Sequence, residues 1–77
     1  MERLIEELTM LADDTGMPRN VKLKIKNAIL ALQDQEVEKS LRANKALSEL
    51  DDLSNDPNIP SYIRPQIWNI VSQLETF

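Results

Sequence analysis

Residues 43–77, ANKALSELDDLSNDPNIPSYIRPQIWNIVSQLETF, repeat the pattern of residues 1–35, MERLIEELTMLADDTGMPRNVKLKIKNAILALQDQ, without a gap. Sliding the chain over itself by 42 positions makes eight of the 35 aligned pairs identical, Pro18 and Pro60 among them. Unrelated chains of average composition match at roughly one position in fifteen to twenty. We therefore predict a single domain, residues 1–77, built from two copies of one unit.

Each copy reads as a helix, a proline-containing turn and a second helix. In both copies apolar residues recur at spacings of three and four, which places them on one face of an α-helix. In the first copy these positions are Leu4, Ile5, Leu8, Leu11 and Ala12 before the turn, and Val21, Ile25, Ala28, Ile29 and Leu32 after it. In the second copy they are Leu41, Ala43, Ala46, Leu47, Leu50 and Leu53, and then Ile63, Ile67, Ile70, Val71 and Leu74. Because no stretch alternates as a β-strand does, we expect an all-α fold, either an antiparallel four-helix bundle or two stacked helix hairpins.

Glycine and polar residues near the turns indicate where the helices end. Gly16 suits the left-handed position just beyond a helix, and Ser61 fits the N-cap of the last helix. Asp14 and Asp56 occupy equivalent places before each turn, where a carboxylate accepting backbone N–H groups explains them better than a metal does. Between the copies we expect Asp34 to cap the third helix, with a continuous helix through this junction as the alternative.

The composition excludes several kinds of chemistry. The chain has no cysteine and no histidine, so it lacks thiolate nucleophiles, disulfides, imidazole metal ligands and the usual general base. Its single glycine lies at a helix end, which leaves no glycine-rich phosphate loop. We therefore expect no enzyme activity, no cofactor and no metal site. The apolar runs are too short to span a bilayer and the first residues do not resemble a signal peptide, so we expect a cytoplasmic protein without membrane contacts.

Charge is unevenly distributed along the chain. The net charge is −4, yet residues 15–33 carry four cations and no acid. At helical spacing Arg19, Lys22 and Lys26 share one face, whereas Lys24 points elsewhere. This face is either an anion- or phosphate-binding surface, or a solvated helix face whose cations pair with acids of neighbouring helices. The negative net charge favours the second interpretation over general nucleic-acid binding.

The three aromatic residues, Tyr62, Trp68 and Phe77, all belong to the region of the last helix. Partly exposed Trp and Tyr side chains are typical anchors of protein interfaces, and they also fill cores. Trp68 follows the core-facing Ile67, so we expect it at the edge of the apolar stripe. It is then either an interface anchor or a core residue packed against the third helix.

The chain also resembles known families. The pattern of a HEAT-type helical repeat is matched in part by Asp14, Pro18 and Val21-Lys22, and by their counterparts Asp56, Pro60 and Ile63-Arg64. More closely, three stretches resemble an uncharacterised family of short archaeal proteins. These stretches are MPRNVK at 17–22, LRANKALSELDDLSNDPNIP at 41–60 and RPQIWNIVSQLE at 64–75. This resemblance implies a cytoplasmic archaeal protein with a compact four-helix bundle, and it implies neither an activity nor a catalytic residue.

These observations favour a small helical protein-interaction module that self-associates. Its surface binds a protein partner or a second copy of the chain. The candidate surface residues are Arg19, Lys22, Lys26, Arg64, Tyr62 and Trp68. The alternative is an RNA- or nucleoprotein-associated factor that uses the basic face of the second helix. Residues that differ between the two copies are better functional candidates than residues that recur in both.

Overall fold

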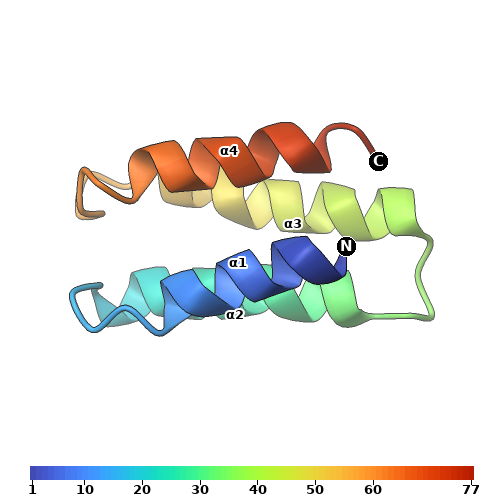
Figure 1. The fold of residues 1–77 in the computed structure, drawn as a ribbon, viewed down its shortest axis with the longest axis horizontal. Coiled ribbons are helices and arrows are strands. Elements are labelled where there is room, and N and C mark those ends of the chain that lie inside the picture. Colours follow the sequence, from blue (N-terminus) through green and yellow to red (C-terminus); the bar gives the residue numbers. More distant parts are fainter.

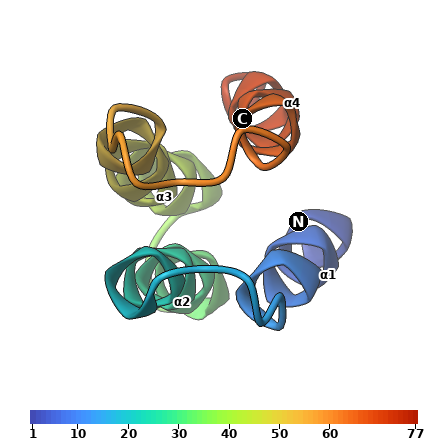
Figure 2. The ribbon, with the colours of Figure 1, turned by 90° about the vertical axis from the view of Figure 1, so that its left-hand side faces the viewer.

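The chain folds into four helices: α1, Glu2–Ala12; α2, Arg19–Gln33; α3, Lys39–Ser54; and α4, Arg64–Leu74. The computed structural model describes the whole chain, residues 1–77. Successive helices run antiparallel, so both termini and the α2–α3 loop lie at one end of the bundle (Figure 1). Viewed along their axes, the helices occupy the corners of a rough square in chain order (Figure 2). The predicted all-α, antiparallel four-helix bundle is confirmed.

The core is entirely apolar. All 18 buried residues are hydrophobic, and no polar or charged residue is buried. In α1, for example, the buried residues include Leu4, Leu8 and Leu11, whose spacing of four and three places them on one helix face. Fully burying a side chain of this size contributes roughly 1.5–3 kcal/mol relative to leaving it exposed. The apolar stripes therefore account for why the helices pack together. No helix combines the length and hydrophobicity that crossing a membrane requires.

The buried positions follow the 42-residue spacing of the sequence. Sixteen of the 18 buried residues form eight pairs at this spacing. The pairs are Leu4/Ala46, Leu8/Leu50, Leu11/Leu53, Met17/Ile59, Val21/Ile63, Ile25/Ile67, Ala28/Ile70 and Leu32/Leu74. Each helix hairpin therefore supplies the same positions to one shared core.

The two edges at which the hairpins meet differ. Helices α2 and α3 make the most extensive contact in the bundle, whereas α1 and α4 approach each other much less closely (Figure 2). The buried faces of α2 and α3 contain the small residues Ala28 and Ala46. Their counterparts on α4 and α1 are Ile70 and Leu4. Small side chains allow helix axes to approach closely, so residue size explains why one edge is closed and the other is wider.

The two proline turns use the same hydrogen bond, as expected. Asp14 Oδ1 accepts the backbone N–H of Gly16 at 2.8 Å, and Asp56 Oδ1 accepts the backbone N–H of Asn58 at 2.8 Å. The predicted role of the two aspartates in their turns is therefore confirmed.

The second carboxylate oxygen of each aspartate links one turn to the other hairpin. The Tyr62 hydroxyl donates to Asp14 Oδ2 at 2.9 Å, and the Asn20 side-chain amide donates to Asp56 Oδ2 at 3.4 Å. Residues 20 and 62 are equivalent in the repeat, as are residues 14 and 56. The two hairpins therefore hold each other's turns through a reciprocal pair of hydrogen bonds.

Two expectations about helix ends were wrong. No residue has a positive φ, so Gly16 does not adopt the left-handed conformation. Ser61 does not cap the last helix, because α4 begins at Arg64 with Ile63 at the N-cap position. A turn over residues 61–63 precedes the helix, and Pro65 lies in its first turn, where proline needs no N–H partner.

The junction between the hairpins is a turn, not a continuous helix. Asp34 is the C-cap residue of α2 and does not cap α3, which begins at Lys39, so that prediction was also wrong. Asp34 Oδ1 accepts the backbone N–H of Glu36 at 3.2 Å, which stabilises the turn itself. The Arg42 Nε donates to the carbonyl oxygen of Val37 at 2.6 Å and fixes the loop against α3.

Candidate functional site: the basic face of α2

The surface of α2 opposite the core combines cations with leucines. The buried residues of the helix, from Val21 to Leu32, follow spacings of four and three. On the opposite side, a second row follows the same kind of spacing and consists of Arg19, Leu23, Lys26 and Leu30. This row forms, with Lys22 beside it, the basic face of α2.

The two leucines on this face are unusually exposed for residues of their size. Leu23 is 60% exposed to solvent and Leu30 is 64% exposed. A single exposed leucine is ordinary, but here two lie on the same helix face at a spacing of seven, with Lys26 between them. Sequence reasoning missed both, although their position outside the buried stripe was a signal that could have revealed them.

Three of the six predicted surface residues come together here. Arg19, Lys22 and Lys26 line one shallow groove with Leu23 and Asn20, and the buried Met17 lies beneath them. The groove follows one side of α2 from its first turn, so one helix supplies nearly all of the contact surface.

The cations on this face make no side-chain hydrogen bond to the rest of the protein, unlike Arg42 and Arg64. The charge of Lys22 contributes to lowering the pKa of Asp14, after the hydrogen bonds from Gly16 and Tyr62. The interpretation in which these cations pair with acids of neighbouring helices therefore has its support at Lys22.

Arg64 does not belong to this surface. Its Nη1 donates to the carbonyl oxygen of Ser54 at 3.2 Å, and its Nη2 donates to that of Asp56 at 3.4 Å. These carbonyls lie at and just beyond the end of α3, where backbone acceptors lack helical partners. Arg64 therefore stabilises the end of α3, and its guanidinium is already engaged.

Tyr62 is also engaged within the protein. Its hydroxyl donates to Asp14, and this hydrogen bond raises the pKa of the Tyr62 phenol. The pKa of Asp14 is lowered first by the backbone N–H of Gly16 and then by the Tyr62 hydroxyl. Both effects follow from hydrogen bonds to the charged carboxylate.

Trp68 is not a core residue, because it is 56% exposed. It lies on α4, one residue beyond the buried Ile67, and it is separated from the basic face of α2 by the bundle. Tyr62 and Trp68 therefore do not form one surface with Arg19, Lys22 and Lys26. No group of three or more acidic residues lies close enough together to hold a metal ion.

Comparison with known proteins identifies a family. The model of the uncharacterised protein family UPF0147 matches residues 1–77. The UPF0147 protein of Sulfurisphaera tokodaii is 40% identical over 76 residues, which cover 99% of this chain and 85% of that protein. The UPF0147 protein of Metallosphaera sedula is 42% identical, with the same coverage of both chains. That of Saccharolobus solfataricus is 44% identical over 69 residues, 90% of this chain and 78% of that protein.

A solved structure shares the fold. The crystal structure of a protein of unknown function superposes with a TM-score of 0.95 and 42% sequence identity, covering 99% of this chain and 86% of that chain. The expected resemblance to an uncharacterised archaeal family is thereby confirmed. The partial resemblance to HEAT-type repeats receives no support from these matches.

Proposed function

Since this chain belongs to the uncharacterised protein family UPF0147, whose description gives no activity, we propose that it is a small helical protein-interaction module. Its binding surface is the basic face of α2, and its partner is an acidic, partly apolar segment of a protein, a second copy of this chain included. This proposal concerns binding alone and includes no chemical step.

The single observation that carries the proposal is the row in which Arg19, Leu23, Lys26 and Leu30 alternate cations with exposed leucines. Burying the leucines against a partner supplies the hydrophobic part of the affinity. The cations attract an acidic partner and fix its orientation, which gives association rate and specificity. An acidic amphipathic helix presents both chemistries at the same spacing.

Nucleic acid is the less favoured occupant. Proteins that bind single-stranded RNA stack its bases on aromatic side chains beside a basic groove. All three aromatic residues belong to the region of α4, and none lines the groove on α2. The net charge of −4 also opposes the approach of a polyanion. The binding experiments described below distinguish RNA binding from binding to a protein partner.

Self-association is the first case to examine, because a second copy offers acidic surfaces. Glu2 and Glu6 are exposed on α1, and Asp51 and Asp52 are exposed on α3. Sedimentation velocity from micromolar to millimolar concentration measures whether such contacts form. An 8.8 kDa species at every concentration removes the homodimer from the proposal.

The decisive test compares charge and apolar variants of the face with a matched control. Affinity capture from the native cells identifies partners, and each purified partner is then titrated with the wild type and the variants. We expect Lys22→Glu combined with Lys26→Glu to weaken binding about tenfold or more, and Leu23→Ser to weaken it several-fold. Lys45→Glu, an exposed lysine on α3, serves as the control and leaves affinity nearly unchanged.

Two results contradict the proposal. One is a partner whose affinity is the same for the wild type and for the charge-reversal variant. The other is binding to bulk RNA at low salt that falls steeply as salt rises, without any protein partner sensitive to Leu23→Ser.

A further inference from the structure

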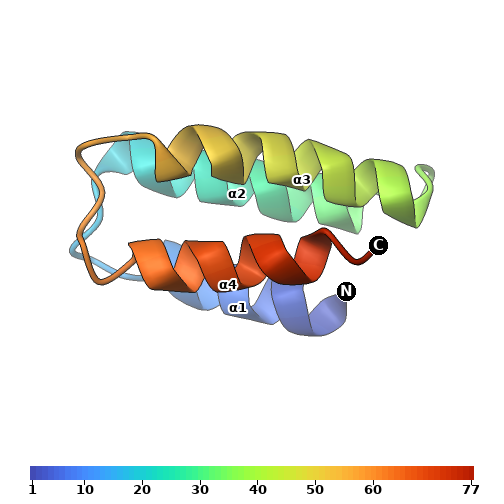
Figure 3. The same cartoon turned by 90° about the horizontal axis from the view of Figure 1, so that it is seen from above.

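The end of the bundle that holds both termini is uneven. Helix α3 has 16 residues whereas α1 and α4 have 11 each. In the repeat, the first residue of α1 aligns with Asn44, so the turn of α3 that starts at Lys39 has no counterpart. The α2–α3 hairpin therefore extends past the start of α1, as Figure 3 shows.

A pocket of about 700 Å³, open to solvent, lies where the α2–α3 hairpin extends past the start of α1. Met1 and Ile5, both partly buried, supply its apolar surface, whereas the core residue Leu32 contributes almost none because it is only 1% exposed. Its size falls within the range of pockets that take small molecules, a few hundred to about a thousand Å³.

The polar part of the pocket is positively charged. Arg3, Lys39 and Arg42 line it, against one acid, Glu2. The remaining polar lining comes from the side-chain amides of Gln33, at the end of α2, and Gln35, in the α2–α3 loop, which donate hydrogen bonds without adding charge. The pocket is therefore locally positive, although the chain has a net charge of −4.

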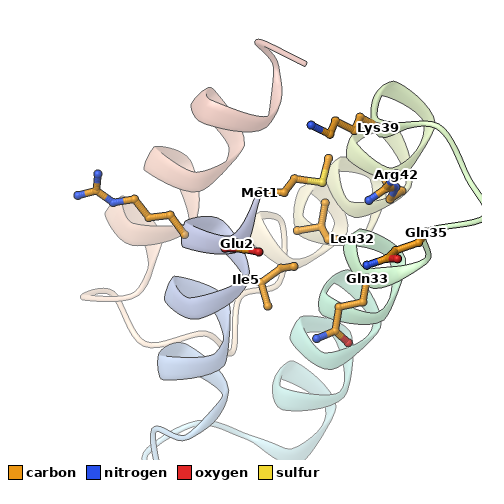
Figure 4. Close-up of a pocket in the computed structure, with 9 residues that line it drawn as sticks. Met1, Glu2, Ile5, Leu32, Gln33, Gln35, Lys39 and Arg42 are labelled. Atoms are coloured by element: carbon orange, nitrogen blue, oxygen red, sulfur yellow. The ribbon is translucent and has the colours of Figure 1, made fainter.

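The α3 cations lie beside the apolar part. In Figure 4, Lys39 extends from α3 to the side of Met1, and Arg42 follows on the same helix, near Gln35. Arg42 is held in this position because its Nε donates to the carbonyl oxygen of Val37 at 2.6 Å. Its two Nη groups remain for a ligand, and a guanidinium held in this way is suited to an oxyanion.

We propose that this pocket binds a small organic phosphate, with the phosphate against Lys39 and Arg42 and a short hydrocarbon part against Met1 and Ile5. The two α3 cations, Lys39 and Arg42, balance the two charges of a phosphate dianion. Lysine provides a point charge and arginine a planar fork, the pair of donors that phosphate sites commonly combine. The pocket is separate from the basic face of α2 and does not depend on the function proposed for that face.

The test uses hexyl phosphate as the probe, at pH 8 where its phosphate is doubly charged. Binding is followed by chemical-shift changes of backbone amides in isotope-labelled full-length protein. We expect the shifts to concentrate in residues 33–42 and 1–5, and the affinity to fall as salt rises. Hexanol, which lacks charge, and hexanoate, which lacks the second charge and the tetrahedral head, are expected to bind at least several-fold more weakly.

Variants assign the binding to these side chains. We expect Lys39→Gln and Arg42→Gln each to lower the affinity for hexyl phosphate about fivefold to tenfold, and Glu2→Gln to raise that affinity. Lys45→Gln, on the same helix but outside the pocket, is the matched control. Lys39 makes no contact that fixes the loop, so its variant tests the site even where Arg42→Gln destabilises residues 34–38.

The proposal is overturned by any of three results: no amide shift at the pocket with millimolar hexyl phosphate, equal weakening by Lys45→Gln and Lys39→Gln, or equal affinity for hexanoate. Combining Lys22→Glu with Lys26→Glu leaves this binding within about twofold, which separates the pocket from the basic face of α2.

Discussion

At the scale of single residues, Asp14 links its own turn to the other hairpin. One of its carboxylate oxygens accepts the N–H of Gly16 and the other accepts the Tyr62 hydroxyl. Both hydrogen bonds favour the ionised carboxylate and lower its pKa, while the phenol of Tyr62 has its pKa raised. The hydrogen bond between Tyr62 and Asp14 therefore weakens at low pH, where the carboxylate is protonated, and at high pH, where the phenol ionises.

Replacing Tyr62 with phenylalanine isolates this dependence. A lowered Asp14 pKa adds stability above about pH 4, and this stability is lost as pH falls through the folded-state pKa. A raised Tyr62 pKa adds stability below about pH 10, and it is lost as pH rises through the folded-state pKa. We expect thermal melts to show Tyr62→Phe a few degrees below the wild type at neutral pH, with the two converging at both extremes. A constant difference across the pH range contradicts this explanation.

Gly16 is required for space, not for its backbone conformation. Its φ is not positive, but an added Cβ meets the Tyr62 hydroxyl oxygen at 3.1 Å and Asp14 Oδ1 at 3.2 Å. Alanine at an unstrained glycine position usually stabilises a protein by roughly 0.4–1 kcal/mol through the unfolded chain. We expect Gly16→Ala instead to lower the melting temperature, and to do so less in the Tyr62→Phe background. Equal effects in both backgrounds contradict a steric role of the hydroxyl.

At the scale of helices, the sequence predicted the elements better than their ends. The spacing of residues such as Ile25 and Ile67 predicts each helix, because burial of one face is a property of the pattern itself. Ser61 and Asp34 have the side chains of helix caps, yet both lie in turns that precede the true helix starts. Cap residues and turn residues use the same short polar side chains, so sequence does not distinguish the two.

The close approach of α2 and α3 gives a test by residue size. Ala28→Ile places at this position the residue found at its equivalent, position 70. Because Ala28 is fully buried, we expect overpacking to destabilise the protein by roughly 1–3 kcal/mol in urea unfolding. Ile70→Ala leaves a cavity and is expected to cost roughly 2–5 kcal/mol. A neutral Ala28→Ile shows that side-chain size does not set the spacing of these helices.

At the scale of the whole molecule, the sequence predicted part of the candidate site. Arg19, Lys22 and Lys26 were grouped correctly because one helix carries all three. Arg64 and Tyr62 do not join them, because Arg64 donates to the end of α3 in its own hairpin and Tyr62 donates to Asp14 in the other hairpin. The pocket at the end of the bundle could not be predicted, because it arises from the relative lengths of helices that meet only in the folded chain.

The wider α1–α4 edge contains the one buried side-chain oxygen without a hydrogen-bond partner, Glu7 Oε2. A buried acceptor without a partner destabilises a protein by roughly 1–3 kcal/mol. We expect Glu7→Met to raise the free energy of unfolding by about 1 kcal/mol in urea. Glu49→Met, at the equivalent position of the second copy, is the control, expected within about 0.5 kcal/mol of the wild type. A destabilised Glu7→Met indicates that the carboxylate has a favourable role in the folded state.

Both termini and the α2–α3 loop lie at the same end of the bundle (Figure 1). The order of the two hairpins along the chain can therefore be exchanged. A circular permutant that links Phe77 to Met1 and is cut within residues 35–37 runs in the order α3, α4, α1, α2. The covalent connection between the hairpins then joins α4 to α1 and no longer joins α2 to α3. Because Ala28 and Ala46, and not the loop, explain the close packing of α2 and α3, the permutant should recover the native helicity and the native core. The same helices would thus tolerate either order of the hairpins along the chain.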